Sequence, residues 1–312
     1  MKKIVITTTS FGEYNKMPLI LLKERGVEIK FNPYSRKLEK NEVVELCKNS
    51  IGIIAGTEAL DADTLEYLAK SAVLQPSLKV ISRCGTGLDN IDLDAAKRLG
   101  IKVFNTPDAT TGAVAELTVG LILNLLRKVN QMDTGIRNGK WEKLMGNLLY
   151  GKMVGIVGFG RIGRKVMELL RSFGCEIRYY DIRTEDEELR TKWKGLRTEF
   201  EELLKTCDII SLHVSSGKQI IGENEIRMMK KGAWLVNVSR GAVVNEEALY
   251  QALKANYLSG VALDVFEQEP YTGPLKEMDN VILTPHIGSY AKESRVRMEI
   301  QAVENLLKGL EG

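Results

Sequence analysis

The sequence is poor in histidine and cysteine, and neither sign of charge dominates it. Only two of its 312 residues are histidines, and its four cysteines are scattered without a C-x-x-C pair. This cysteine usage argues against a disulfide framework and predicts a reducing, cytoplasmic location. The chain has 44 basic and 41 acidic residues, a net charge of +3, so the charge pattern gives no case for a nucleic-acid or membrane partner.

Long hydrophobic runs are absent as well. No stretch approaches the roughly 18 consecutive apolar residues of a membrane span. Met1–Thr7 contains a short apolar run that predicts a first strand rather than a signal peptide. Hydrophobic residues still make up 44% of the chain, enough for a globular core, and a chain of this length has room for two domains of ordinary size.

A G-x-G-x-x-G pattern stands at Gly158, Gly160 and Gly163. The residues before it, Val154–Val157, have the composition of a buried strand, and Arg161–Phe173 after it has the apolar spacing of a helix. A glycine turn between strand and helix lets the backbone approach a pyrophosphate and points the helix N-terminus at it. The pattern therefore predicts a dinucleotide site.

An acidic residue supports this interpretation. Asp181 ends the next apolar strand, Ile177–Tyr180, where a carboxylate can accept hydrogen bonds from an adenosine ribose. The alternative, a glycine turn that only allows close helix packing, leaves Asp181 unexplained. We expect NAD to be favoured over NADP because Asp181 would repel a 2′-phosphate, although Arg183, two residues on, could soften that discrimination.

Short apolar runs alternate with amphipathic stretches over residues 1–105 and again over residues 151–286. The strands expected in the first region are Ile4–Thr8, Val27–Phe31, Ile51–Ala55, Val80–Ser82 and Lys102–Phe104. The strands expected in the second region are 154–157, 177–180, 208–213, 234–238, 260–264 and 281–284. This alternation predicts an α/β fold with two doubly wound parallel sheets, each covered by helices on both faces.

Two further helices are expected. Gly112–Arg127 is apolar nearly all round, so it should be buried on several sides, between domains or between subunits. Ala291–Gly312 should form a helix after the final strand.

Three predicted strand ends carry residues suited to acid–base and anion chemistry. Arg240 follows the strand at 234–238 and offers a planar fork for a carboxylate. The segment Asp264–Pro270 supplies carboxylates after the next strand, and His286 follows the last one. A carboxylate that orients a histidine also raises its pKa, which suits a general acid or base. The other histidine, His213, lies at the tail of a strand and is expected to be structural.

The sequence resembles the D-isomer-specific 2-hydroxyacid dehydrogenase family over essentially its whole length. The nearest likeness is to the D-3-phosphoglycerate dehydrogenase branch without the C-terminal regulatory extension of that enzyme. The motifs that carry the resemblance are Arg83–Asp92, Asn105–Pro107, Val114–Glu116, the glycine run with Asp181, Val238–Gly241, Asp264–Pro270 and Thr284–Gly288.

The resemblance implies a role for each candidate residue. His286 would be the acid/base, Glu269 its partner, and Arg240 the residue that binds the substrate carboxylate. The implied cofactor is NAD, and its expected ligands are Gly158, Gly160, Arg161, Ile162, Gly163, Asp181 and Asp264, of which Asp264 would hold the nicotinamide carboxamide. The implied substrate ligands are Arg83, Thr86, Gly87 and Arg240, and no metal site is expected.

The resemblance also implies a domain arrangement. A Rossmann NAD domain, residues 102–287, would be inserted into a flavodoxin-like substrate domain made of residues 1–101 and 288–312. The inserted domain would form a homodimer through the region of the helix Gly112–Arg127.

Three departures from the family pattern bear on function. Ala55 and Gly56 stand where phosphoglycerate enzymes usually carry Arg-Ser for the substrate phosphate, although Arg83 keeps the other basic position. The segment after His213 is shorter than usual, and Ala113 replaces a common serine. We expect D-3-phosphoglycerate and 3-phosphohydroxypyruvate as the substrate pair. The alternatives are a glyoxylate or hydroxypyruvate reductase and a non-enzymatic, NAD(H)-sensing protein of the corepressor type.

Overall fold

The computed structural model describes residues 2–70, 78–183 and 196–311. The chain divides into two compact units, one formed by Met1–Thr110 with Ser289–Gly312 and the other by Thr111–Gly288. The first boundary lies at Thr110 rather than at the expected residue 101. The reason is that strand β5 (Lys102–Phe104) pairs with β4 (Val80–Arg83) and so belongs to the first sheet.

The first unit is built on a five-stranded parallel sheet in the order β2-β1-β3-β4-β5. Its other strands are β1 (Lys3–Ile6), β2 (Glu28–Phe31) and β3 (Gly52–Ala55). Its helices are α1 (Met17–Glu24), α2 (Lys40–Cys47), α3 (Ala62–Lys70), α4 (Leu93–Arg98) and α12 (Lys292–Glu311). This is the flavodoxin-like strand order, in which ligands bind where the order reverses, between the carboxyl ends of β1 and β3.

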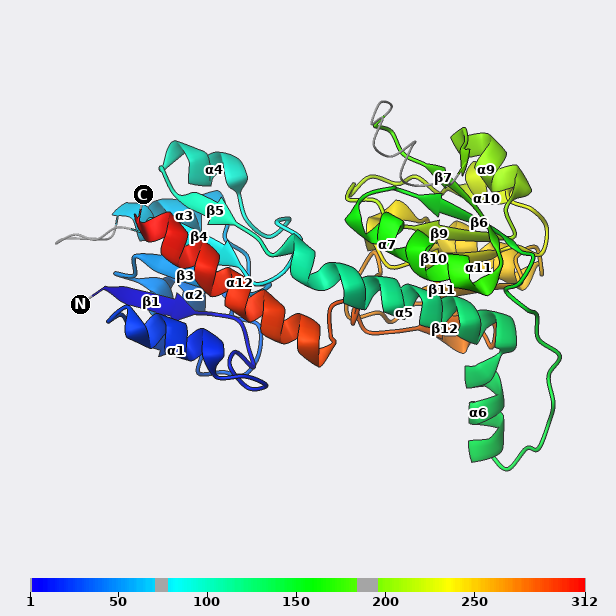
Figure 1. Ribbon diagram of the computed structural model, residues 1–312, viewed down its shortest axis with the longest axis horizontal. Coiled ribbons are helices and arrows are strands. Elements are labelled where there is room, and N and C mark those ends of the chain that lie inside the picture. The colour runs from blue at the N-terminus through cyan, green and yellow to red at the C-terminus, as the bar shows by residue number, and fades with distance from the viewer. Residues whose placement is uncertain (1, 71–77, 184–195, 312) are drawn as a thin grey trace. The chain divides into compact units, whose positions relative to one another are not determined.

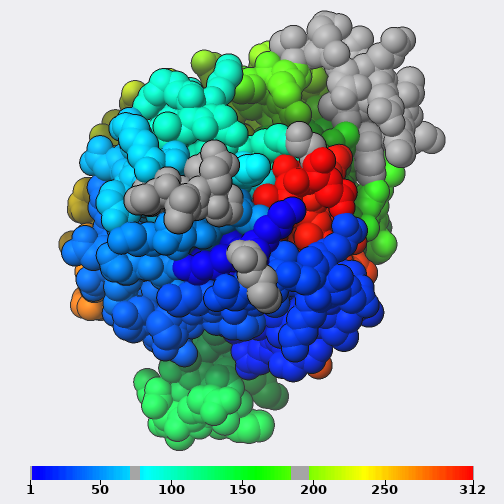
Figure 2. All heavy atoms as spheres, turned by 90° about the vertical axis from the view of Figure 1, so that its left-hand side faces the viewer, coloured from blue at the N-terminus to red at the C-terminus, as the bar shows by residue number. Residues whose placement is uncertain are grey.

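The C-terminal helix completes the first unit. α12 lies across the sheet in Figure 1 and contacts β3, β4, β5 and α1. Its end, coloured red, lies beside the blue N-terminal segments in Figure 2. Arg295 of α12 donates hydrogen bonds to Thr8 Oγ1 and the Thr9 carbonyl, and it pairs with the buried Glu299 at 2.6 Å. These contacts fix the loop that follows β1.

The second unit is built on a seven-stranded parallel sheet in the order β12-β11-β10-β9-β6-β7-β8. The strands are β6 (Met153–Val157), β7 (Glu176–Tyr180), β8 (Leu196–Arg197), β9 (Ile209–Leu212), β10 (Trp234–Asn237), β11 (Gly260–Leu263) and β12 (Val281–Leu283). The order is that of a Rossmann sheet with one further strand. Six of these strands were expected. β8 has only two residues and shows no hydrophobic alternation.

The helices of the second unit include α6 (Val129–Arg137), α7 (Arg161–Leu170), α9 (Phe200–Thr206), α10 (Glu223–Met228) and α11 (Glu246–Lys254). Three short 3₁₀ turns lie at Arg171–Phe173, Gly241–Val243 and Pro274–Glu277. In Figure 1, α6 projects away from the sheet of its own unit.

The apolar helix α5 (Pro107–Arg127) contains the expected helix Gly112–Arg127. By length and composition alone it could cross a membrane, and half of its most apolar window is buried in the structure. Its side chains Leu121, Ile122 and Leu126 pack in one core cluster with Val154 and Ile156 of β6. The burial shows that the helix serves as a core helix.

Candidate active site

The carboxyl ends of three adjacent strands carry the expected acid–base residues. β10, β11 and β12 are neighbours in the second sheet and run parallel. Arg240, Glu269 and His286 therefore follow strands that end at one edge of the sheet. This is the edge where ligands bind in doubly wound folds.

His286 and Glu269 form a direct pair. The imidazole Nδ1 of His286 lies 2.9 Å from Oε2 and 3.1 Å from Oε1 of Glu269. The side chains are 52% and 41% exposed, so a ligand or solvent can reach them. A carboxylate at Nδ1 fixes the tautomer and leaves Nε2 to exchange protons with another group. The structure thus brings together the two residues that were predicted as a pair.

The loop that carries His286 is held by a buried aspartate. Asp264 is 1% exposed, and its carboxylate accepts hydrogen bonds from Thr284 Oγ1 (2.6 Å) and from the main-chain N–H groups of Ile287 (2.8 Å) and Gly288 (2.8 Å). His286 itself has a left-handed backbone, with φ +55°. A non-glycine residue adopts this conformation rarely, and surrounding contacts have to impose it. Asp264 supplies such contacts on both sides of His286.

Arg240 is positioned by its neighbours at the end of β10. Asn237 Oδ1 accepts from the Ser239 N–H, and Asn237 Nδ2 donates to the Arg240 carbonyl. A Cβ on Gly241 would overlap the Phe266 carbonyl, so the backbone after Arg240 lies directly against the segment that leads to Glu269. The loops after β10 and β11 are therefore in direct backbone contact, and only glycine fits at position 241.

The glycine turn has the geometry that a dinucleotide site requires. It runs from β6 to α7, and Gly158 has φ +90°, a conformation that L side chains rarely adopt. A Cβ on Gly158 would also lie 2.6 Å from the His213 carbonyl oxygen. These two observations fit a backbone turn that must approach a pyrophosphate closely, with α7 beginning at Arg161 immediately after it.

Asp181 follows β7, beside the glycine turn. It is 7% exposed, and its carboxylate accepts from the Phe159 N–H at 2.7 Å. Arg183 forms an ion pair with the same carboxylate, with Nη2 2.7 Å from Oδ2. Burial raises the pKa of Asp181, but the hydrogen bonds from Arg183 and Phe159 outweigh burial and bring the pKa to about 2. Asp181 is therefore ionised at neutral pH.

The first unit presents the loop expected to bind the substrate carboxylate. Thr86 is exposed and Gly87 is half-buried, and neither main-chain N–H has an acceptor among the described residues. Thr86 Oγ1 lies 2.6 Å from Thr110 Oγ1, and the Thr86 carbonyl accepts from Asn105 at 2.7 Å. The loop is thus fixed by contacts that do not use its two N–H groups.

Sequence reasoning missed two supporting residues of these loops. Thr284 donates to Asp264, and Glu58, 1% exposed, accepts from Thr7 Oγ1 and from the Gly56 N–H at the end of β3. The signal available for Thr284 was its place in the Thr284–Gly288 motif. For Glu58 no signal in the sequence distinguished it from a surface acid.

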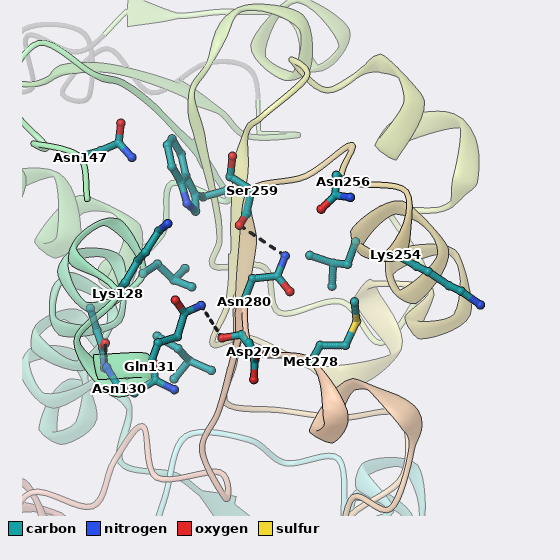
Figure 3. A pocket seen from close by; sticks show the side chains of 15 residues that line it. Lys128, Asn130, Gln131, Asn147, Lys254, Asn256, Ser259, Met278, Asp279 and Asn280 are labelled. Atoms are coloured by element: carbon teal, nitrogen blue, oxygen red, sulfur yellow. Dashed lines mark hydrogen bonds between the residues drawn. The ribbon is translucent and has the colours of Figure 1, made fainter. Parts of the chain in front are cut away.

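A cavity of about 560 Å³ lies at the other, amino-terminal edge of the second sheet (Figure 3). It opens beside the first residue of β10, Trp234, and the residue before β12, Asn280. Its lining is rich in side-chain amides and includes none of the candidate residues.

The second histidine, His213, lies outside this cavity, directly after β9. Burial lowers its pKa to about 3, and its Nε2 is 2.8 Å from Ser211 Oγ.

Comparison with known proteins identifies the family of the chain. Residues 119–288 match the model of the NAD binding domain of D-isomer specific 2-hydroxyacid dehydrogenases. A glyoxylate reductase of Thermofilum pendens is 43% identical over 268 residues, which cover 82% of this chain and 77% of that protein. A D-3-phosphoglycerate dehydrogenase of Methanocaldococcus jannaschii is 39% identical over 282 residues, which cover 88% of this chain but 52% of that protein.

Solved structures of related enzymes have the same fold as this chain. The crystal structure of a glyoxylate reductase from Paecilomyes thermophila matches with a TM-score of 0.86 and 31% identity, over 99% of this chain and 96% of that one. Three observations indicate NAD as the cofactor: the glycine turn, the acid after β7 and the match to the NAD-binding model over most of the second unit. The chain belongs to the D-isomer specific 2-hydroxyacid dehydrogenase family and is an NAD-dependent oxidoreductase of small 2-hydroxy and 2-oxo acids.

Proposed function

We propose that the enzyme reduces a small unphosphorylated 2-oxo acid, either glyoxylate to glycolate or hydroxypyruvate to D-glycerate. The observation that carries this proposal is the loop after β3. Where phosphoglycerate enzymes usually place Arg-Ser, this chain has Ala55 and Gly56 above a buried carboxylate, Glu58.

The space at this loop is tight for a side chain at position 56. A Cβ on Gly56 would lie 2.8 Å from a carboxylate oxygen of Glu58 and 3.0 Å from the Cα of Thr8. Glu58 accepts from the Gly56 N–H at 3.0 Å, which removes a main-chain donor that an anion would need. A phosphomonoester brings about two negative charges, and a buried carboxylate beneath the loop opposes them.

The remaining basic position, Arg83, is engaged with its own loop. Its Nη1 donates to the Cys84 carbonyl, and its guanidinium fills the space that a Cβ on Gly85 would occupy. These contacts support a role in fixing the loop before Thr86. The expectation that Arg83 binds a phosphate is therefore replaced by the proposal that it positions the Thr86 and Gly87 N–H groups.

The proposed acid–base machinery is the pair His286 and Glu269. His286 holds the proton at Nε2 that is transferred to the carbonyl oxygen of the oxo acid. Glu269 accepts from Nδ1 and stabilises the protonated imidazole before the transfer. Asp264 maintains the loop conformation that directs the ring.

Arg240 and the N–H groups of Thr86 and Gly87 are proposed to bind the substrate carboxylate. A guanidinium can donate two parallel hydrogen bonds to a carboxylate, which fixes orientation as well as position. The bound cofactor supplies the hydride to the carbonyl carbon. Gly158, Gly160, Arg161, Ile162, Gly163 and Asp181 are proposed to hold that cofactor.

A second candidate is the 3-phosphohydroxypyruvate reaction expected from the sequence. It is favoured by the relative from Methanocaldococcus jannaschii and by the basic residue at Arg83. A panel of 2-oxo acids, followed by loss of NADH absorbance, distinguishes the two. We expect higher kcat/KM for glyoxylate or hydroxypyruvate than for 3-phosphohydroxypyruvate. A preference for the phosphorylated acid would reject the first proposal and leave the dehydrogenase chemistry intact.

Arg83→Ala provides a second comparison. If Arg83 fixes the loop, the loss in kcat/KM should be similar for hydroxypyruvate and its phosphorylated form. A loss that is larger for the phosphorylated acid by about 1.5–3 kcal/mol, the value of a charged hydrogen bond, would instead assign a phosphate to Arg83.

We further propose that the chain forms a homodimer through its NAD-binding unit. The segment that follows α5 exposes large apolar side chains: Val129 (52%), Ile136 (55%), Trp141 (84%), Met145 (88%), Leu148 (67%) and Tyr150 (74%). Such a concentration typically marks an interaction surface. Light scattering after chromatography should show a dimer that Met145→Glu weakens.

A cytoplasmic location is also proposed, since all four cysteines are free.

A further inference from the structure

We infer that Glu246 is a positioning residue for the reduction, because its carboxylate holds the backbone of the loop that carries Glu269. Glu246 is the first residue of α11. The inference rests on the proposed function, in which Glu269 and His286 act as a pair. Glu246 acts through Glu269 and not on the substrate or the cofactor.

Glu246 and Glu267 are connected by two hydrogen bonds that run in opposite directions. The Glu267 N–H donates to Oε1 of Glu246 at 2.7 Å, and the Glu246 N–H donates to Oε1 of Glu267 at 3.4 Å. The Glu246 N–H belongs to the first turn of α11, where main-chain N–H groups have no acceptor within the helix. The start of α11 is therefore connected to the loop after β11 at Glu267, two residues before Glu269.

The peptide between Phe266 and Glu267 is also fixed by close packing. A Cβ on Gly241 would overlap the Phe266 carbonyl and would lie 2.5 Å from the Glu267 nitrogen. The Phe266 ring stacks on Tyr271, with the ring centroids 4.5 Å apart. The packing limits where this peptide can lie, and the Glu246 carboxylate fixes the direction of its N–H.

This part of the loop determines where the Glu269 carboxylate lies. The Phe266 N–H donates to Oε1 of Glu269 at 3.2 Å, and the same oxygen is 3.1 Å from Nδ1 of His286. The Glu269 side chain is 41% exposed, so hydrogen bonds rather than burial have to fix its orientation. A shift of the backbone at Phe266 and Glu267 would misalign the carboxylate with the imidazole, and small displacements at a reacting pair have large kinetic effects.

The connection keeps two carboxylates close together. Burial raises the pKa of Glu246, the hydrogen bond from the Glu267 N–H lowers it, and the Glu267 carboxylate raises it, so that the net direction is upward. The negative charge of Glu246 is thus opposed by its surroundings, whereas its acceptor oxygen is used. A glutamine at this position keeps the acceptor and removes the charge, so Glu246→Gln and Glu246→Ala separate the two properties.

Steady-state kinetics of the two variants test the inference. We expect Glu246→Ala to lower kcat by about tenfold, while its NADH affinity stays within about twofold because the glycine turn is untouched. The alkaline limb of its kcat profile should also move to lower pH, because a displaced Glu269 stabilises the protonated imidazole less well. Glu246→Gln should restore kcat to within about twofold of the unmodified enzyme, since the acceptor oxygen remains. Equal losses in the two variants would overturn the inference.

Glu225→Ala is the matched control for an effect on stability alone. The Glu225 carboxylate also accepts from a main-chain N–H, that of Gly222 at 2.9 Å, in the first turn of α10. This variant should lower the Tm as Glu246→Ala does, but it should leave kcat and the pH profile unchanged.

A double variant shows whether Glu246 acts through Glu269. In a Glu269→Gln background, Glu246→Ala should change kcat by less than about twofold, because the two effects are not additive when one residue positions the other. An undiminished loss in that background, or a Glu246→Ala enzyme with a normal kcat and pH profile, would overturn the inference while the proposed acid–base pair stands. If Glu269→Gln alone has a normal kcat and pH profile, the proposed pair is rejected, and the inference with it.

Discussion

The Asp264→Asn substitution tests whether the buried aspartate positions the loop of His286. In the structure, Oδ1 accepts from Thr284 and Ile287, and Oδ2 accepts from Gly288. An asparagine can keep the two bonds at its carbonyl oxygen, but its amide group faces the Gly288 N–H with a donor. The substitution therefore removes one hydrogen bond to a charged group and weakens two others, at a site that is 1% exposed.

The magnitude follows from these contacts. Losing one charged hydrogen bond costs about 1.5–3 kcal/mol, and the two weakened bonds add roughly 1 kcal/mol. A loss of about 3 kcal/mol leaves a typical domain folded, but it lowers the Tm of a unit of this size by roughly 6–12 °C. We also expect kcat to fall at least tenfold, since a small displacement of a catalytic group has large kinetic effects.

Thermal unfolding, steady-state kinetics and NADH titration measure the three consequences separately. The matched control is Asp208→Asn, because Asp208 also accepts from a main-chain N–H, that of Met153 at 2.9 Å, at the start of β6. It should lower the Tm while leaving kcat nearly unchanged. An Asp264→Asn enzyme with kcat within twofold and an unchanged Tm would refute the reasoning. A loss confined to NADH affinity would instead favour the family-based role of Asp264 in holding the carboxamide.

Three further substitutions address the remaining side chains. His286→Ala should lower kcat by about 10²–10⁴-fold, the usual contribution of general acid catalysis, with little change in NADH affinity; near-normal turnover with every active oxo acid would remove His286 from the mechanism. Arg240→Lys keeps the charge but loses the planar fork, so kcat/KM for the oxo acid should fall much more than NADH affinity; an unaffected kcat/KM would place the carboxylate ligand elsewhere. His213 is neutral when folded because burial lowers its pKa from 6.5 to about 3, whereas the unfolded chain gains a proton below about pH 6.5. As the pH is lowered from about 6.5 to about 3, this residue should therefore decrease the free energy of unfolding by about 1.4 kcal/mol per pH unit. Urea titrations at several pH values should show that the free energy of unfolding of His213→Gln depends less steeply on pH; equal dependence on pH would contradict the buried neutral form.

Much of the architecture was predictable because it depends on local periodicity. Both sheets follow from short apolar runs that alternate with amphipathic stretches. The glycine turn follows from its G-x-G-x-x-G spacing, and the long helix follows from a segment that is apolar nearly all round. β8 was not predictable, since two residues carry no period. The strand Lys102–Phe104 was expected in the first region, and its pairing with β4 bears this out. The boundary at Thr110 was not predicted, because it lies within the continuous helix α5 (Pro107–Arg127) and no turn or composition change marks it.

Part of the candidate site was also predictable from the sequence, and part of it was not. Parallel topology brings the ends of β10, β11 and β12 together, so the nearness of Glu269 and His286 could be argued from the order of strands alone. The partners of a carboxylate depend instead on separations of a few tenths of an ångström. Asp181 fits the NAD pattern in the sequence, yet in the structure Arg183 occupies the acceptor positions on which that pattern depends. The motif therefore predicts where the carboxylate lies, whereas the hydrogen-bond partners of that carboxylate include a neighbouring side chain outside the motif.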